Sequence, residues 1–150
     1  MNKIYVSEVL LMKIAIAANE QGRVLKEQVK TFLAEHDYEV LDQSSSDIFA
    51  ATMNIVTAIN NKTADKGIVI DEYGVAPFMI ANKNHGIICA AVYDDYTSKM
   101  TRRHNATQII TLGSAISAEK IACELALNFS ESQYDGGRHQ IRIDMLDRMV

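Results

Sequence analysis

The chain has 150 residues, a size typical of one domain, and 48% of them are hydrophobic, which supports a folded core and excludes a disordered chain. Its 15 Lys and Arg and 19 Asp and Glu give a net charge of −4, which argues against binding nucleic acid through bulk positive charge. No apolar run reaches the roughly 20 residues of a membrane span, and the start lacks the pattern of a signal peptide, so we expect a cytoplasmic protein with no membrane partner.

Short apolar runs typical of buried strands alternate with longer stretches of helical periodicity from residue 12 onward. This alternation predicts parallel strands joined by right-handed crossovers. We therefore expect a single doubly wound, Rossmann-like α/β sandwich with a five-stranded parallel sheet and a C-terminal helix. In chain order, the pattern predicts strand 12–18, helix 22–36, strand 38–41, helix 47–61, strand 67–71, a helix ending at 82, strand 86–93, helix 96–104, strand 108–112, a helix from 117 and a last helix from about 138.

Residues 1–11 do not follow this alternation. Met12 and Lys13 form a natural start for the first strand, so we assign 1–11 to an N-terminal extension and 12–150 to the domain. An additional edge strand over 3–9 is the alternative. In the helix that starts near 117, we place Ile121, Leu125 and Phe129 on the inward face.

The two cysteines, Cys89 and Cys123, both lie in apolar surroundings. Without a CxxC pair or a Cys/His cluster, the sequence supports neither a disulfide framework nor a zinc site, and we interpret both thiols as inert core residues. The turn at 19–22 has a single glycine where a dinucleotide-binding loop needs GxGxxG. We therefore predict no cofactor and no metal.

Ligands of doubly wound sheets bind beyond the carboxyl ends of the strands. We place five segments there, namely 18–22, 71–77, 93–95, 102–105 and 112–114. In 71–77, Asp71 and Glu72 are as well explained by a structural or capping role as by catalysis. In 102–105, His104 is either a general acid or base or a cation at a helix C-terminus.

Arg138 and Arg142 are four residues apart, so they project from one face of the last helix, near its start. Two guanidinium groups in this position suit a phosphate monoester. Pairing with Asp144, Asp147 or a neighbouring helix is the alternative.

These features occur in an order that resembles the ribose-5-phosphate isomerase B and galactose-6-phosphate isomerase family. The resemblance covers residues 12–149 and is most specific in the segment Gly-Gly-Arg-His-Gln-x-Arg over 136–142. It implies a metal-independent aldose–ketose isomerase that opens a sugar ring and forms a cis-enediol(ate). It also implies that His104 is the ring-opening acid or base, that Asn105 holds sugar oxygens, and that Arg138 and Arg142 bind phosphate.

The chain departs from the family in the other half of the site. Where relatives have a cysteine base followed by Gly-Thr-Gly-x-Gly, this chain has Asp-Glu-Tyr-Gly-Val-Ala over 71–76, and Asn19 and Glu20 replace Asp-His. Because family sites lie between subunits, the resemblance implies completion by a different, cysteine-bearing, LacB-like subunit, with galactose 6-phosphate as the substrate. The alternatives are a self-sufficient pentose-phosphate isomerase homodimer with Asp71 or Glu72 as base, and a non-catalytic sugar-phosphate-binding subunit.

Overall fold

Five parallel strands form one sheet in the order β2-β1-β3-β5-β4. The computed structural model describes residues 10–149, so the alternative strand over 3–9 lies outside the described residues. The strands are β1 (Lys13–Ala18), β2 (Glu39–Asp42), β3 (Lys66–Asp71), β4 (Cys89–Ala91) and β5 (Ile109–Gly113).

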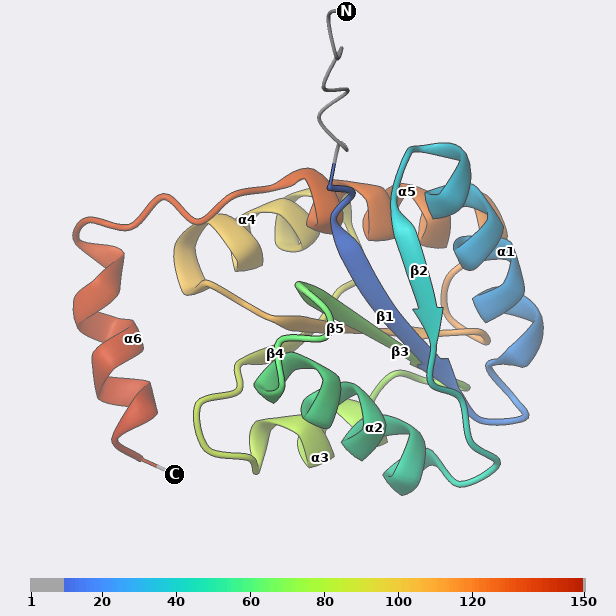
Figure 1. Cartoon of the computed structure of the whole chain (residues 1–150), viewed down its shortest axis with the longest axis horizontal. Helices are drawn as coiled ribbons and strands as arrows, with labels where there is room; N and C mark the ends of the chain where they lie inside the picture. The colour runs from blue at the N-terminus through green and yellow to red at the C-terminus, as the bar shows by residue number, and fades with distance from the viewer. Residues whose placement is uncertain (1–9, 150) are drawn as a thin grey trace, which may run out of the picture.

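Helices cover both faces of the sheet, as Figure 1 shows, which confirms the predicted doubly wound sandwich. One layer contains α1 (Arg23–Glu35), α4 (Asp95–Asn105) and α5 (Glu119–Glu131). The other layer contains α2 (Ile48–Asn60) and α3 (Ala76–Asn82). The last helix, α6 (His139–Asp147), belongs to neither layer and packs against α4.

The sheet separates two apolar clusters. The central strands β1, β3 and β5 are buried on both faces, which explains why they appear in the sequence as continuous apolar runs. The cluster under α1 and α5 includes Leu33, Ile70, Leu112, Leu125 and Phe129. The cluster under α2 and α3 includes Ile55, Val69, Ala81, Cys89 and Ile109.

Two sequence predictions were wrong in detail. The strand predicted over 86–93 is only the three residues of β4. In α5, Ile121 is 49% exposed, whereas Ala122, Leu125, Ala126 and Phe129 are fully buried. Because those four follow one another at intervals of three, one and three residues, they form the stripe that faces the sheet, and Ile121 lies outside it.

Both cysteines are buried in the core. Burial raises the pKa of the Cys89 thiol to about 12. Burial, helped by Glu119 and Glu124, raises the pKa of the Cys123 thiol to about 11. Both thiols are therefore protonated at neutral pH and poorly nucleophilic.

Replacing Cys89 or Cys123 by alanine is expected to lower the free energy of unfolding by about 1 kcal/mol, because each change removes a buried sulfur. The isomerase turnover that the sequence resemblance implies should stay within about twofold of wild type, since neither thiolate forms at neutral pH. Urea unfolding and steady-state rates check this. A loss of turnover with unchanged stability would place essential chemistry on one of these thiols.

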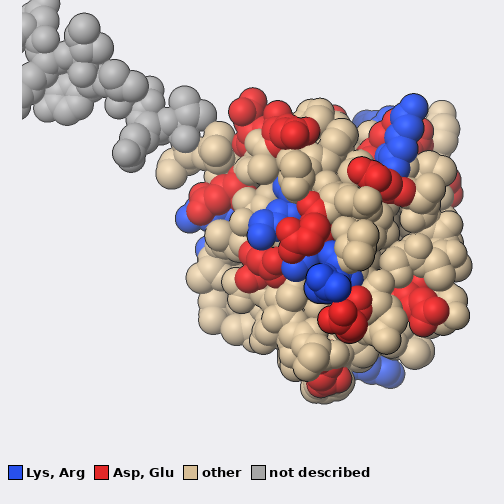
Figure 2. Space-filling model, turned by 90° about the vertical axis from the view of Figure 1, so that its right-hand side faces the viewer, with Lys and Arg blue, Asp and Glu red and all other residues tan. Residues whose placement is uncertain are grey.

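Charges of opposite sign are interleaved on the surface that α1 and β2 form (Figure 2). Lys26 Nζ lies 2.7 Å from both Glu27 Oε1 and Asp42 Oδ2, and Lys30 Nζ lies 3.6 Å from Asp42 Oδ2. Burial alone would raise the pKa of the Asp42 carboxyl, but hydrogen bonds from Lys26 and Ser44 outweigh it and lower that pKa to about 2.

Within residues 10–149, no helix is long and apolar enough to cross a bilayer.

The Asp42 carboxylate is expected to stabilise the fold above about pH 4 and to lose this effect as the pH falls toward 2, because its folded-state pKa lies below the unfolded value near 3.9. Asp42→Asn should therefore cost on the order of 2 kcal/mol at pH 7 and little at pH 2. Urea unfolding across this range measures both values. The same change at exposed Asp37 is the control, and a pH-independent cost for Asp42→Asn would contradict the assignment.

Candidate active site

The segment 102–105 lies at the amino ends of the strands, so its predicted position beyond their carboxyl ends was wrong. Helix α4 starts at Asp95, just after β4, and its last residue Asn105 precedes the first residue of β5, Ile109. A crossover helix between parallel strands must return the chain to the amino ends before the next strand begins. The C-terminal end of α4 is therefore on the opposite side of the sheet from Asp71.

Three of the four predicted site residues line one cavity of about 340 Å³. The cavity runs beside β4 and α4, and its polar lining includes Thr97, Thr101, His104, Asn105 and Arg142. His104 and Asn105 come from the last turn of α4, whereas Arg142 comes from α6. The packing of α6 on α4 thus brings together side chains that are 37 or 38 residues apart in the chain.

Arg142 is held in place from α4. Its Nη2 donates to Asn105 Oδ1 at 2.8 Å and to the backbone oxygen of His104 at 3.3 Å. Among residues 10–149, none of the ion pairs involves Arg138 or Arg142, and Asp144 instead accepts a hydrogen bond from Gln140. Asp144 and Asp147 therefore do not neutralise these arginines, but the other part of that alternative, pairing with a neighbouring helix, holds for Arg142 through its hydrogen bonds to α4.

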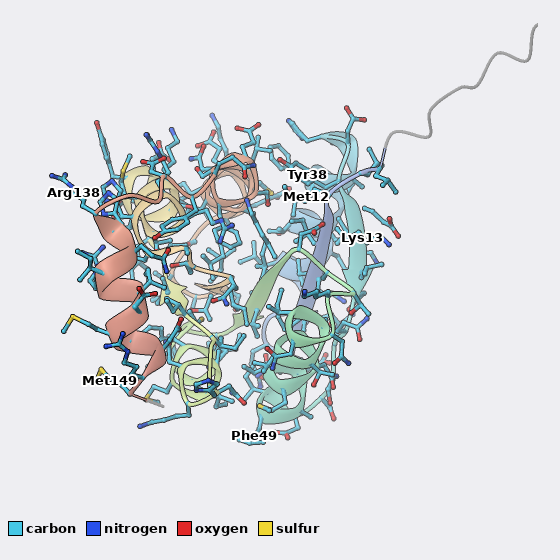
Figure 3. The ribbon with its side chains drawn as sticks, turned by 60° about the vertical axis from the view of Figure 1, so that its left-hand side comes forward. Met12, Lys13, Tyr38, Phe49, Arg138 and Met149 are labelled. Carbon is cyan, nitrogen blue, oxygen red and sulfur yellow. The ribbon has the colours of Figure 1, made fainter. Side chains whose placement is uncertain are left out.

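Arg138 lies at the N-cap of α6, one turn before Arg142. It is exposed, and Figure 3 shows it at the start of α6, on the outer side of the molecule. The described residues that line the cavity do not include it. Of the four predicted site residues, Arg138 is therefore the one that lies outside the cavity lining.

His139 lies next to the site, although no role was predicted for it from the sequence. Its ring stacks on the ring of His104, with the centroids 4.3 Å apart and the planes 12° apart. Partial desolvation and the positive charges of His104, Arg138 and Arg142 lower the pKa of His139. His139 is therefore mostly neutral at pH 7. Its position between Arg138 and Arg142 in the sequence was the feature that could have indicated that it lies near the site.

At the carboxyl end of β3, Asp71 is engaged in local structure. Its Oδ1 accepts a hydrogen bond from the backbone N–H of Gly74 at 2.5 Å, and Thr111 Oγ1 donates to the oxygen of Gly74 at 2.6 Å. Gly74 has a φ of +75°, which favours glycine, so the residue type and these hydrogen bonds together define the turn. The geometry favours the structural alternative for Asp71, while Glu72 is exposed and raises the pKa of the adjacent Tyr73 hydroxyl.

The turn after β1 is also occupied by interactions within the chain. Asn19 Oδ1 accepts from the N–H of Gly22 at 3.2 Å, and Glu20 Oε1 lies 3.3 Å from Arg23 Nε. A Cβ atom on Gly22 would lie 2.1 Å from the oxygen of Ile70, so glycine is needed here for close packing against β3. Asn19 thus serves the turn itself, whereas Glu20 and Arg23 form an exposed pair that contributes little to the fold.

The described residues thus form a parallel α/β domain with a His–Asn–Arg cavity beside the edge strand β4 and a tightly bonded turn at the carboxyl end of β3. Within residues 10–149 there is no group of three His, Cys, Asp or Glu side chains that could hold a metal ion. Residues 14–146 match the ribose/galactose isomerase family. The chain belongs to this family.

Related sequences agree with this assignment. The chain is 47% identical to galactose-6-phosphate isomerase subunit LacA 2 of Streptococcus pyogenes serotype M1, over 92% of this chain and 99% of that protein. It is 44% identical to subunit LacA 1 of Streptococcus agalactiae serotype III, with the same coverage. These relatives bear out the resemblance found in the sequence.

Solved structures agree as well. Ribose-5-phosphate isomerase B of Clostridium thermocellum superimposes with a TM-score of 0.89 at 29% identity, over 92% of this chain and 97% of that one. The enzyme from Mycoplasma genitalium, solved with bound ribulose 5-phosphate, gives a TM-score of 0.86 at 26% identity, over 93% and 97%. Relatives by sequence and by structure are thus aldose–ketose isomerases or their subunits.

Proposed function

We propose that this chain is a subunit of a galactose-6-phosphate isomerase and supplies the ring-opening and phosphate-binding half of a shared site. The reaction converts galactose 6-phosphate to tagatose 6-phosphate through a cis-enediol(ate). The observation that carries this proposal is that His104, Asn105 and Arg142 line one cavity, to which Asp71 does not contribute.

Phosphate binding is the role of the two arginines of α6. Asn105 and the backbone of His104 hold one nitrogen of Arg142, so its planar group is already oriented when a phosphate arrives. Arg138 approaches the same ligand from solvent. Because Asn105 Oδ1 accepts from Arg142, the side-chain NH₂ of Asn105 is the group that remains to hold a sugar oxygen.

Ring opening is the role of His104. An imidazole can act as both general base and general acid, so it can take a proton from the anomeric hydroxyl and return one to the ring oxygen. The ring that stacks on His104 is that of His139. Because the pKa of His139 is lowered, this neighbouring ring adds little positive charge beside His104. The open-chain aldehyde then carries an acidic proton on C2.

The cavity lacks a base for that C2 proton. Among the described residues that line it there is no carboxylate and no thiol, so His104 would have to serve both the ring oxygen and the carbon. Within one chain, Asp71 does not line the cavity, and Cys89 and Cys123 are buried and protonated. We therefore propose that a cysteine-bearing, LacB-like subunit places its base against this cavity.

The substrate is tested by the ratio of kcat/KM on two sugar phosphates. The complex of this chain with a cysteine-bearing partner should favour galactose 6-phosphate over ribose 5-phosphate, with tagatose 6-phosphate as the product. Coupled assays or NMR of the product give both values. A higher kcat/KM for ribose 5-phosphate would instead make the complex a pentose-phosphate isomerase.

A further inference from the structure

Lys66 is a buried lysine with three backbone partners. It is the first residue of β3 and is only 2% exposed. Its Nζ donates to the backbone oxygens of Phe129, Ser130 and Ser132 at 3.1, 2.7 and 2.7 Å, and it lies 5.5 Å from the centre of the Phe129 ring. Its ammonium thus binds the C-terminal end of α5.

A cation stabilises a helix most when it lies at the C-terminal end. The last carbonyl groups of an α-helix have no donor within the helix and carry the negative end of its dipole. Burial, followed by the charge of Arg102, lowers the pKa of Lys66 to about 8, while Asp65 raises it slightly. Lys66 is therefore mostly charged at pH 7 and fixes the point where the chain leaves α5.

The segment that leaves this point carries the arginines of the site. Residues 133–138 connect α5 to α6, and Arg138 is the N-cap of α6. Among the described residues of α6, only Ile143 is buried, so the hydrophobic contribution to its position is small. The position of α6 therefore depends on the contacts that hold the connecting segment more than it would for a helix with a wide apolar face.

A second anchor lies on the surface. The N–H of Asp135 donates to the oxygen of Arg103 at 2.9 Å, and the Asp135 carboxylate lies 3.2 Å from Arg103 Nη2. Both side chains are more than a third exposed, and exposed ion pairs contribute little. Lys66 is thus the buried anchor of the segment.

We infer that Lys66 is a positioning residue for phosphate binding: by holding the end of α5, it sets where α6 begins and so places Arg138 and Arg142. This inference rests on the proposed function, because it concerns the phosphate half of the same site. Lys66 lies at the buried end of α5, and we assign it no contact with substrate.

The test uses Lys66→Met in the complex with the cysteine-bearing partner. Methionine keeps most of the buried stem and removes the ammonium. We expect KM for galactose 6-phosphate to rise by about 3- to 10-fold with kcat within about twofold, because displaced phosphate ligands weaken ground-state and transition-state binding alike. The affinity for inorganic phosphate, measured by calorimetry, should fall by the same factor.

Ser98→Ala is the matched control, since Ser98 Oγ also donates to a backbone oxygen of α5, that of Leu125 at 2.6 Å, but far from the connecting segment. It should lower the melting temperature and leave KM and phosphate affinity unchanged. If Lys66→Met does not fold, Lys66→Gln, whose shorter amide reaches fewer of the carbonyls, should show a smaller shift in the same direction. Unchanged KM and phosphate affinity in a folded Lys66 variant would overturn the inference, whereas a wild-type complex that binds phosphate but turns over no sugar phosphate would overturn the proposed function alone.

Discussion

Replacing His104 by alanine in the complete complex is expected to slow isomerisation of the cyclic sugar phosphate by about 100- to 10,000-fold, the usual contribution of a positioned acid or base. In the proposed mechanism the imidazole carries protons between the anomeric hydroxyl and the ring oxygen, and neither Asn105 nor Arg142 can do this at neutral pH. The defect should shrink for an analogue that stays open-chain, because that substrate needs no ring opening.

Steady-state kinetics on the cyclic and open-chain substrates measure this difference. His36→Ala is the control, since His36 is exposed and follows α1, away from the cavity. Size-exclusion chromatography must show that the His104 variant still assembles. Equal impairment of both substrates by an assembled variant would contradict ring opening and leave His104 a binding or structural role.

Replacing Arg142 by alanine should lower kcat/KM by roughly 10- to 150-fold, because charge-assisted hydrogen bonds to phosphate are worth about 1.5 to 3 kcal/mol. Arg142→Lys should recover only part of this loss. A lysine ammonium is a point charge that cannot donate to Asn105 and to a phosphate in the geometry of a planar fork.

Arg148→Ala is the control for Arg142, because Arg148 is an exposed arginine at the other end of the same helix. It makes the same change in charge and should leave kcat/KM within about twofold of wild type. Full rescue by lysine would show that Arg142 acts only through its charge. No loss in Arg142→Ala would remove it from the phosphate site.

The fold was largely predictable because its central strands are short apolar runs between amphipathic helices. The order of the strands was not predictable, since hydrophobic periodicity records which face of an element is buried and says nothing about its neighbours. Strand β4 was predicted too long because Ile87 and Ile88 continue the apolar pattern of Cys89. Ile87 is buried without belonging to a strand.

The members of the candidate site were easier to predict than their location. The histidine, asparagine and arginines stand out by chemical type, and three of them line one cavity. The placement of His104 and Asn105 at the carboxyl ends of the strands failed because it ignored the direction in which α4 returns the chain. Lys66 was missed because a lysine at the start of a strand is usually solvated, and its partners are backbone oxygens more than 60 residues away.

The central claim is that this chain holds only one half of a site, and isomerase activity before and after mixing tests it most directly. The purified chain alone should show no turnover of galactose 6-phosphate or ribose 5-phosphate, and adding a family subunit that carries the cysteine base should restore turnover of galactose 6-phosphate. Robust activity of the chain alone that is abolished by Asp71→Asn would contradict this account and identify a self-sufficient enzyme with a carboxylate base.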